Sequence, residues 1–179
     1  MGVRRALDYL LPAGYQGATM NLRALCLLAL TLSVVLPAAA ATPAQAPDFT
    51  LQSDHGGAYR LAESRGKEVV VLFAWASWCP SCREEMPLMN QLHAGLAGLP
   101  VRLFGVNMQE QPQQVARARA AHDLKFDILL DLEGAFGRAY NIYGIPQVMV
   151  IDKQGRLRYR DFGPPSDLVE AVKALAAEE

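Results

Sequence analysis

Cysteine is scarce in this chain, and that scarcity narrows the chemistry open to it. The 179 residues include 3 cysteines and 3 histidines. A structural zinc site needs four Cys or His ligands, which come in pairs at matching spacing. Only Cys79 and Cys82 form a close pair, whereas Cys26 lies far from them in the sequence and the histidines are scattered. The sequence therefore gives no support for a zinc site, and we expect neither a metal nor a cofactor.

The chain also lacks an excess of charge of either sign. It has 17 Lys and Arg residues against 18 Asp and Glu residues, which gives a formal net charge of −1. Binding to nucleic acids and to anionic membrane surfaces relies on a strongly basic protein surface. We therefore expect no nucleic-acid partner.

Charged residues are missing between Arg23 and Asp48, where the apolar run 24–36 is followed by alanines that end at Ala41. A short positive segment, an apolar run and an Ala-x-Ala site together are typical of a secretory signal peptide. We expect Met20 to be the true start and the protein to be exported to the periplasm, with cleavage near Ala41. Because the apolar run is close to the lower length limit for crossing a bilayer, an uncleaved membrane anchor is the alternative.

The rest of the chain is long enough for one domain with its own core. Strand and helix patterns alternate and end in a hairpin and a helix, which indicates an α/β sheet of mixed direction covered by helices on both faces. The predicted organisation is an N-terminal extension and signal peptide over 1–41, a linker over 42–47 and the domain over 48–179. The expected strands cover 49–51, 58–61, 68–75, 101–106, 127–130, 148–151 and 157–162, and the expected helices cover 80–97, 112–122, 134–140 and a last helix capped by Ser166 that ends near 177.

The most informative motif is Trp-Cys-Pro-Ser-Cys at 78–82, which lies just after the apolar run 69–74. The strand pattern gives way to a helix pattern at this point, with Pro80 in the first helical turn. The free backbone N–H groups of a helix start stabilise negative charge and lower the pKa of a cysteine placed there. We therefore expect Cys79 to be the attacking thiolate and Cys82, one turn further on, to be the resolving thiol.

Other uses of this cysteine pair fit the sequence less well. A covalently attached haem needs a His directly after the second cysteine, and Arg83 occupies that position. A bridge between two cysteines this close in sequence closes a very small loop, so it restricts the unfolded chain little and is a weak structural staple. The sequence favours a redox-active disulfide between Cys79 and Cys82.

The unit of strand, C-x-x-C and helix, followed by Tyr-Gly-Ile-Pro at 143–146 and another strand, resembles the thioredoxin fold. The finer pattern W-C-x-x-C-x-x-E-x-P, met at 78–87, resembles the TlpA/ResA/DsbE group of exported thiol-disulfide oxidoreductases. The similarity covers about 47–177. It implies a thioredoxin-like fold, in which helices flank a mixed central sheet on both faces, with an N-terminal β-hairpin and a helix–strand insertion.

The resemblance also assigns residues to the substrate-binding surface. It implies a cis peptide bond before Pro146, a form that only a small minority of X–Pro bonds adopt. The backbone of Ile145 would then be free to pair with an extended substrate segment. Trp78, Pro80 and Ser81 are expected to belong to the same surface.

The tuning of the two cysteines is expected to differ from that in thioredoxin itself. Phe73 stands where thioredoxin has a buried Asp, so that proton relay is absent. Glu85, one helical turn beyond Cys82, resembles the acidic residue of the group, since a carboxylate near a thiol can raise the pKa of the thiol and carry its proton. Gln147 departs from the Thr or Ser that is common after the cis proline.

Thiol-disulfide exchange by Cys79 and Cys82 is the function that these features predict. The intervening Pro80 and Ser81 carry no charge to stabilise a thiolate, which favours the reducing direction. By resemblance, the partners are protein thiols and disulfides of the cell envelope, for example apocytochrome c thiols during cytochrome c maturation. The resemblance implies a membrane electron donor of the DsbD/CcdA type.

Two other functions remain as alternatives at this point. A peroxiredoxin-like peroxidase needs Pro-x-x-x-Thr/Ser-x-x-Cys, and Leu72 and Ala76 occupy the Pro and Thr places before Cys79. A copper-handling thioredoxin-fold protein would bind the metal through two thiolates and a His or nearby methionines. The methionines in question are Met86 and Met89, which the helix pattern places in the core instead.

Overall fold

The computed structural model describes residues 43–178. The predictions for the N-terminal extension, the signal peptide or anchor and Cys26 concern residues outside this range. Among the described residues, no helix has both the length and the apolar character needed to cross a membrane.

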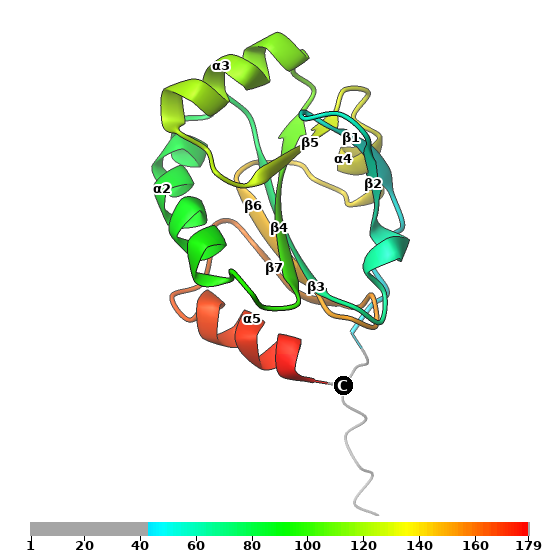
Figure 1. Ribbon diagram of the computed structural model, residues 1–179. Coiled ribbons are helices and arrows are strands. Elements are labelled where there is room, and N and C mark those ends of the chain that lie inside the picture. The colour runs from blue at the N-terminus through cyan, green and yellow to red at the C-terminus, as the bar shows by residue number, and fades with distance from the viewer. Residues whose placement is uncertain (1–42, 179) are drawn as a thin grey trace, which may run out of the picture. The chain divides into compact units, whose positions relative to one another are not determined.

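Seven strands form one mixed sheet in the order β2-β1-β5-β4-β3-β6-β7 (Figure 1). Strands β3, β4 and β5 run parallel, whereas β6 pairs antiparallel with β3. The hairpin β1–β2 extends the sheet beside β5, and β7 extends it beside β6. The strands are β1 (Thr50–Ser53), β2 (Ala58–Arg60), β3 (Val69–Trp75), β4 (Val101–Met108), β5 (Asp127–Asp131), β6 (Gln147–Ile151) and β7 (Leu157–Asp161).

The continuous apolar run before the dithiol forms β3, which lies inside the sheet and is buried along its whole length. A parallel strand with neighbours on both sides and cover on both faces needs such a run. Its carboxyl end meets the start of β6, because Ala74 lies opposite Gln147. We call this end of the strands, where the dithiol turn follows β3, the dithiol end. The opposite end of the strands, where Val70 pairs with Ile151, is the distal end.

Helices cover both faces of the sheet, which confirms the predicted thioredoxin-like architecture (Figure 1). Helices α2, α3 and α5 contribute buried side chains to the core on one face, and α4, the short 3-10 helix η1 and the N-terminal hairpin contribute to the core on the other. Alternate residues of β3 supply both cores, as the pleat requires. The helices are η1 (Leu61–Ser64), α2 (Pro80–Gly95), α3 (Pro112–His122), α4 (Ala135–Ala139) and α5 (Leu168–Ala177). The predicted helix–strand insertion corresponds to α3 and β5.

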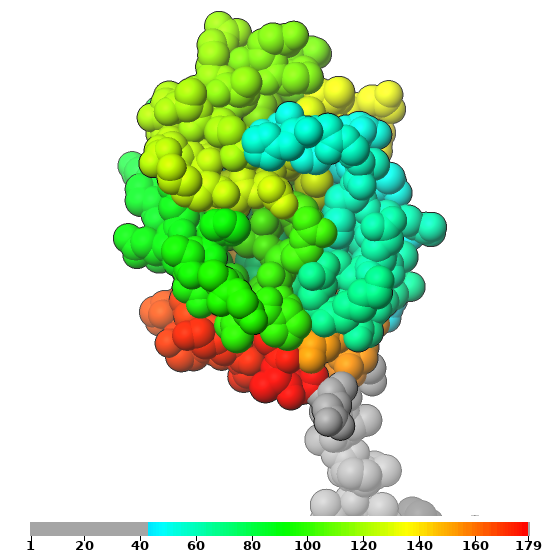
Figure 2. All heavy atoms as spheres, in the orientation of Figure 1, coloured from blue at the N-terminus to red at the C-terminus, as the bar shows by residue number. Residues whose placement is uncertain are grey.

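The predicted N-terminal hairpin is present as β1 and β2. Its turn contains Gly56 and Gly57, whose φ angles of 93° and 78° lie in the left-handed region that glycine adopts without steric cost. In Figure 2 the hairpin (cyan) lies against the yellow-green segment that contains β5, with which β1 pairs.

Residues 44–46, which the sequence places in the linker, are joined to the distal end of the sheet. The N–H of Ala46 donates to the carbonyl of Gly155 at 2.9 Å, and the N–H of Leu157 donates to the carbonyl of Ala44 at 2.9 Å. Ala46 is also buried in the core on the α4 face. The packed structure therefore starts within the predicted linker.

The last helix corrects one prediction. Its N-cap residue is Asp167 and not Ser166, and no side chain caps its first turn. The N–H of Leu168 donates to the carbonyl of Pro165 at 3.1 Å, so a turn after two consecutive prolines leads into α5. The prediction that Ser166 caps the helix is wrong because it considered only the residue type, and the turn that starts at Pro165 moves the start of the helix one residue further on.

Candidate active site

Cys79 is the N-cap residue of α2, at the helix start where the sequence places it. Its Sγ accepts a hydrogen bond from the backbone N–H of Cys82 at 3.1 Å. The sulfur therefore lies over a helix N-terminus, whose free N–H groups favour a thiolate. The two cysteines form a disulfide with Cα atoms 5.3 Å apart. Cys79 is 4% exposed and Cys82 is 0% exposed, so Cys79 is the more accessible residue.

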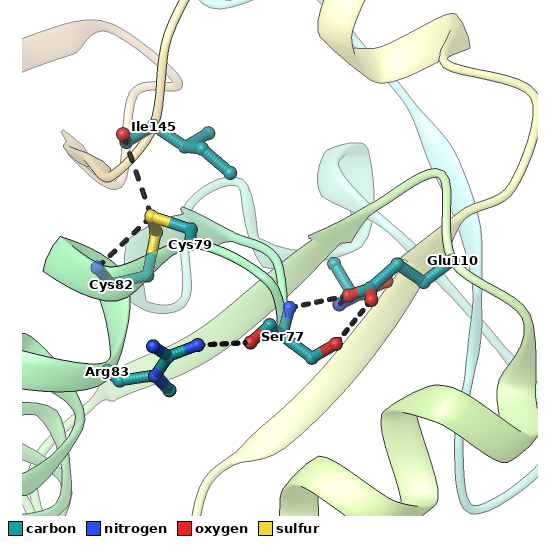
Figure 3. Close-up of a disulfide and its surroundings, with 7 residues drawn as sticks. Ser77, Cys79, Cys82, Arg83, Glu110 and Ile145 are labelled. Atoms are coloured by element: carbon teal, nitrogen blue, oxygen red, sulfur yellow. Dashed lines mark hydrogen bonds between the residues drawn. A yellow bond between two sulfur atoms is a disulfide. The ribbon is translucent and has the colours of Figure 1, made fainter.

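The loop before β6 lies opposite the dithiol. The peptide bond between Ile145 and Pro146 is cis, which confirms that implication of the resemblance. The carbonyl oxygen of Ile145 lies 3.8 Å from Sγ of Cys79 (Figure 3). A substrate sulfur bonded to Cys79 would therefore be placed beside this loop.

The surface next to the dithiol presents exposed side chains. Trp78 is 66% exposed and Tyr143, two residues before Ile145, is 91% exposed. Pro80 and Ser81 are exposed as well. Exposed aromatic side chains beside a reactive group are typical of contact surfaces. Of the predicted substrate-binding residues, Trp78, Pro80 and Ser81 are thus accessible to a partner. Ile145 is half-buried and Pro146 is buried. Their contact with substrate stays a prediction.

Glu85 lies on α2 one turn beyond Cys82 and is half-buried. The carboxylate of Glu85 points toward Gly163 in the loop after β7. A Cβ atom built on Gly163 would lie 3.5 Å from Oε1 of Glu85. Among the described residues, Glu85 makes no hydrogen bond or ion pair. Its role in tuning the thiols stays a prediction.

Sequence reasoning missed a buried carboxylate behind the dithiol turn. Glu110, 4% exposed, follows β4. Its Oε2 accepts hydrogen bonds from the backbone N–H of Ser77 at 2.6 Å and from Nδ2 of Asn107 at 2.8 Å, and its Oε1 is bonded to the Ser77 hydroxyl at 2.5 Å. The available signal was only a Glu just after a central strand, which does not identify a partner 33 residues away.

Three polar side-chain atoms at the dithiol end are buried without a hydrogen-bond partner among the described residues: Nε1 of Trp75, Oδ1 of Asn107 and Oε1 of Gln147. Trp75 lies opposite Asn107 in the sheet. Gln147 is 6% exposed, so it contributes little side-chain surface beside Pro146. Phe73, at the position of the thioredoxin Asp, is fully buried in the core.

The residues invoked for the two alternative functions lie in the interior. Met86 and Met89 are 1% and 0% exposed in the core beneath α2, which confirms their prediction as core residues. Within residues 43–178, no three His, Cys, Asp or Glu side chains gather as a metal site would require. Leu72 and Ala76, at the Pro and Thr places of a peroxidase, are buried and supply no hydroxyl group.

A disulfide at a helix N-terminus, opposite a cis X–Pro loop at the end of a mixed sheet, defines a thiol-disulfide oxidoreductase of the thioredoxin fold. Comparison with known protein families identifies the family of the chain. Residues 43–160 match the AhpC/TSA family, and the chain belongs to this family.

Named relatives agree with the class. The chain is 35% identical over 120 residues to the thiol-disulfide oxidoreductase ResA of Geobacillus kaustophilus, which covers 67% of this chain and 68% of the relative. It is 34% identical over 135 residues to the thiol:disulfide interchange protein DsbE of Escherichia coli K12, covering 72% and 70%. A thiol:disulfide interchange protein of the thioredoxin family from Chlorobium tepidum has a crystal structure that matches with a TM-score of 0.66 and 27% identity, covering 76% of this chain and 99% of that chain. The protein is a thiol-disulfide oxidoreductase.

Proposed function

We propose that the protein reduces disulfides of exported proteins through Cys79 and Cys82. The observation that carries the proposal is the placement of the Cys79 sulfur, which lies over the start of α2 and 3.8 Å from the carbonyl oxygen of Ile145. This sulfur is stabilised as a thiolate by the helix and faces a backbone group that an extended substrate can pair with.

In the first step, the Cys79 thiolate attacks one sulfur of a substrate disulfide. A mixed disulfide forms, the substrate S–S bond breaks, and the leaving substrate sulfur takes up a proton. In the second step, the Cys82 thiolate attacks the Cys79 sulfur, and the second substrate sulfur leaves and is protonated. Two electrons have then passed to the substrate, and Cys79 and Cys82 form a disulfide, the form in which the structure holds them. An electron donor must return two electrons and two protons, and we propose a membrane protein of the DsbD/CcdA type.

The reducing direction follows from the charges between the cysteines. Strong oxidants have a reduced form stabilised by an unusually acidic first thiol. Pro80 and Ser81 add no positive charge to the helix terminus. Glu85, a carboxylate one turn beyond Cys82, would favour the protonated thiols if its charge acts on them.

Export to the periplasm is part of the proposal. The positive segment, apolar run and alanines that end at Ala41 support a signal peptide or an uncleaved anchor. Exported substrates with closely spaced cysteines, such as apocytochrome c, present the disulfide that this exchange would reduce.

Trapping tests the proposed roles of the two cysteines. The Cys82→Ala variant should accumulate mixed disulfides with envelope proteins, because the second step cannot occur. The double variant Cys79→Ala/Cys82→Ala is the matched control and should trap none. If Cys79→Ala traps partners and Cys82→Ala does not, the assignment of attacking and resolving sulfurs is reversed.

Equilibration with glutathione buffers tests the direction. A reduction potential well below about −120 mV, the value of a strong oxidant, supports a reductase. A value near that figure would contradict the reducing direction while leaving thiol-disulfide exchange intact.

A further inference from the structure

The connection between β3 and α2 determines where Cys79 lies, and Ser77 is its most firmly held residue. The backbone N–H and the hydroxyl of Ser77 are both bonded to the carboxylate of Glu110, at 2.6 Å and 2.5 Å. The carbonyl oxygen of Ser77 accepts a hydrogen bond from Nη1 of Arg83 at 3.0 Å. Figure 3 shows Ser77 between these two side chains, next to the dithiol. Every polar group of Ser77 is therefore bonded to another part of the chain.

Glu110 is itself anchored to the centre of the sheet. Its Oε2 accepts a hydrogen bond from Nδ2 of Asn107 at 2.8 Å. Asn107 is 0% exposed and lies on β4 opposite Trp75, the last residue of β3. A continuous path of hydrogen bonds thus runs from the central strand β4, through Glu110, to the residue two positions before Cys79.

We infer that Glu110 is a positioning residue for thiol-disulfide exchange, which acts through its hydrogen bonds to Ser77. These bonds hold the turn so that the Cys79 sulfur stays over the start of α2 and faces the carbonyl of Ile145. The inference rests on the proposed role of Cys79 as the attacking sulfur. A nucleophile displaced by about 1 Å can lose on the order of 100-fold in rate, so the anchoring of this turn has a kinetic consequence.

A matched pair of variants separates the hydrogen bonds from the charge. In Glu110→Gln the amide oxygen can accept from Ser77 N–H and from Asn107, and the amide N–H₂ can donate to the Ser77 hydroxyl, which also accepts hydrogen bonds. This variant removes the negative charge and can keep all three bonds. Glu110→Ala removes the charge and the bonds together.

The experiment compares these variants in the full chain by two measurements on the reduced protein. The first is the rate of exchange with a small aromatic disulfide, and the second is the midpoint pH of Cys79 alkylation by iodoacetamide, followed by mass mapping. We expect Glu110→Ala to lower the exchange rate at least about tenfold and to raise the alkylation midpoint, because the sulfur no longer stays over the helix start. We expect Glu110→Gln to stay within about threefold of the unaltered rate and to show no upward shift.

Two further variants serve as controls. Asp152→Asn alters a buried carboxylate at the distal end and should change neither measurement. Ser77→Ala removes only the hydroxyl bond and should lower the exchange rate by less than Glu110→Ala does. If circular dichroism shows that Glu110→Ala does not fold, Ser77→Ala decides, and an unaltered rate and midpoint there would overturn the inference.

Equal effects of Glu110→Gln and Glu110→Ala on both measurements would mean that Glu110 acts by its charge, and would overturn a positioning role. Unaltered values in both variants would overturn it as well. Failure of the proposed function is distinguishable, because a protein that reduced no envelope substrate would still show the alkylation midpoint that reports the position of Cys79.

Discussion

Both ends of the central sheet bury carboxylates, and Asp152 at the distal end is hydrogen-bonded differently from Glu110 at the dithiol end. At the distal end, Asp152 is 2% exposed and its Oδ2 accepts hydrogen bonds from Nε of Arg156 at 2.8 Å and Nη1 of Arg158 at 3.1 Å. At the dithiol end, Glu110 is 4% exposed and accepts only from neutral groups, a backbone N–H, a hydroxyl and the amide of Asn107.

The difference separates stability from reactivity. Burial by itself raises the pKa of Asp152, but the backbone N–H of Arg156 and the two guanidinium groups outweigh it and leave this pKa below its usual range. This cluster joins the end of β6 to the start of β7. Neutral donors at Glu110 fix a turn without placing a bonded cation on that carboxylate. The distal end therefore stabilises the fold, and the dithiol end holds the geometry of the reaction.

The largest effect is expected from the sulfur at the dithiol end. Cys79→Ser should lower disulfide reduction by about 10³-fold or more, because no other group replaces the nucleophile. Its free energy of unfolding, measured by urea titration of both reduced proteins, should change by less than about 1 kcal/mol, since the serine is nearly isosteric. A larger loss of stability would show that Cys79 also stabilises the fold, and would contradict the assignment of stability to the distal end and reactivity to the dithiol end.

A smaller effect, on stability alone, is expected at the distal end. Asp152→Asn should lower the free energy of unfolding by about 2 kcal/mol, because two arginines lose their anionic partner. The pKa of Asp152 is lowered in the folded state, so its contribution is present above the unfolded pKa of about 3.9 and is lost as pH falls through the folded value. The variant should therefore lose less stability on acidification below about pH 4. Urea titrations at neutral and acid pH measure this, and an altered exchange rate in the variant would contradict the comparison.

A shift in reactivity without a change in stability is expected from Glu85. Glu85→Gln should lower the midpoint pH of thiol alkylation by less than about one unit, because a nearby negative charge favours the protonated thiols. Glu84→Gln is the matched control, since Glu84 is the exposed neighbour on the same helix. Equal alkylation midpoints in the two variants would show that Glu85 affects the thiols no more than the exposed Glu84 does.

The smallest effect concerns Tyr59, which is bonded to Ser64 at 2.6 Å, and Ser64 in turn donates to Glu68 just before β3 at the distal end. Tyr59→Phe should cost about 1 kcal/mol of unfolding free energy through the lost hydrogen bond. Burial raises the pKa of Tyr59 to about 12. Its contribution is therefore complete below the unfolded pKa of about 10 and is lost as pH rises through about 12. Urea titrations at pH 8 and 11 check this, and an equal cost at both values would contradict the sign.

The sequence predicts the structure correctly where an element follows from neighbouring residues. The apolar run of β3, the helix start at Cys79 and the hairpin glycines are local patterns, and each led to the element that the structure contains. The cis bond before Pro146 came from the resemblance and not from a local rule.

The contacts that the sequence does not predict depend on pairing between distant segments. Glu110 meets Ser77 because β3 and β4 pair in a register that places Trp75 beside Asn107. Residues 44–46 showed no periodic pattern, and their backbone bonds to the turn after β6 become visible only once the sheet is assembled. A single sequence without strand register carries no signal for such contacts.

Residues 44–46 offer a point of attachment that lies far from the dithiol. They join the sheet at the distal end, whereas Cys79 lies at the dithiol end. A domain coupled to a bead through its N-terminus would thus present its sulfur away from the support, and large substrate proteins could approach it from solution. Coupling through position 78, next to Cys79 in the sequence, would instead place the support at the surface that we propose for substrate binding.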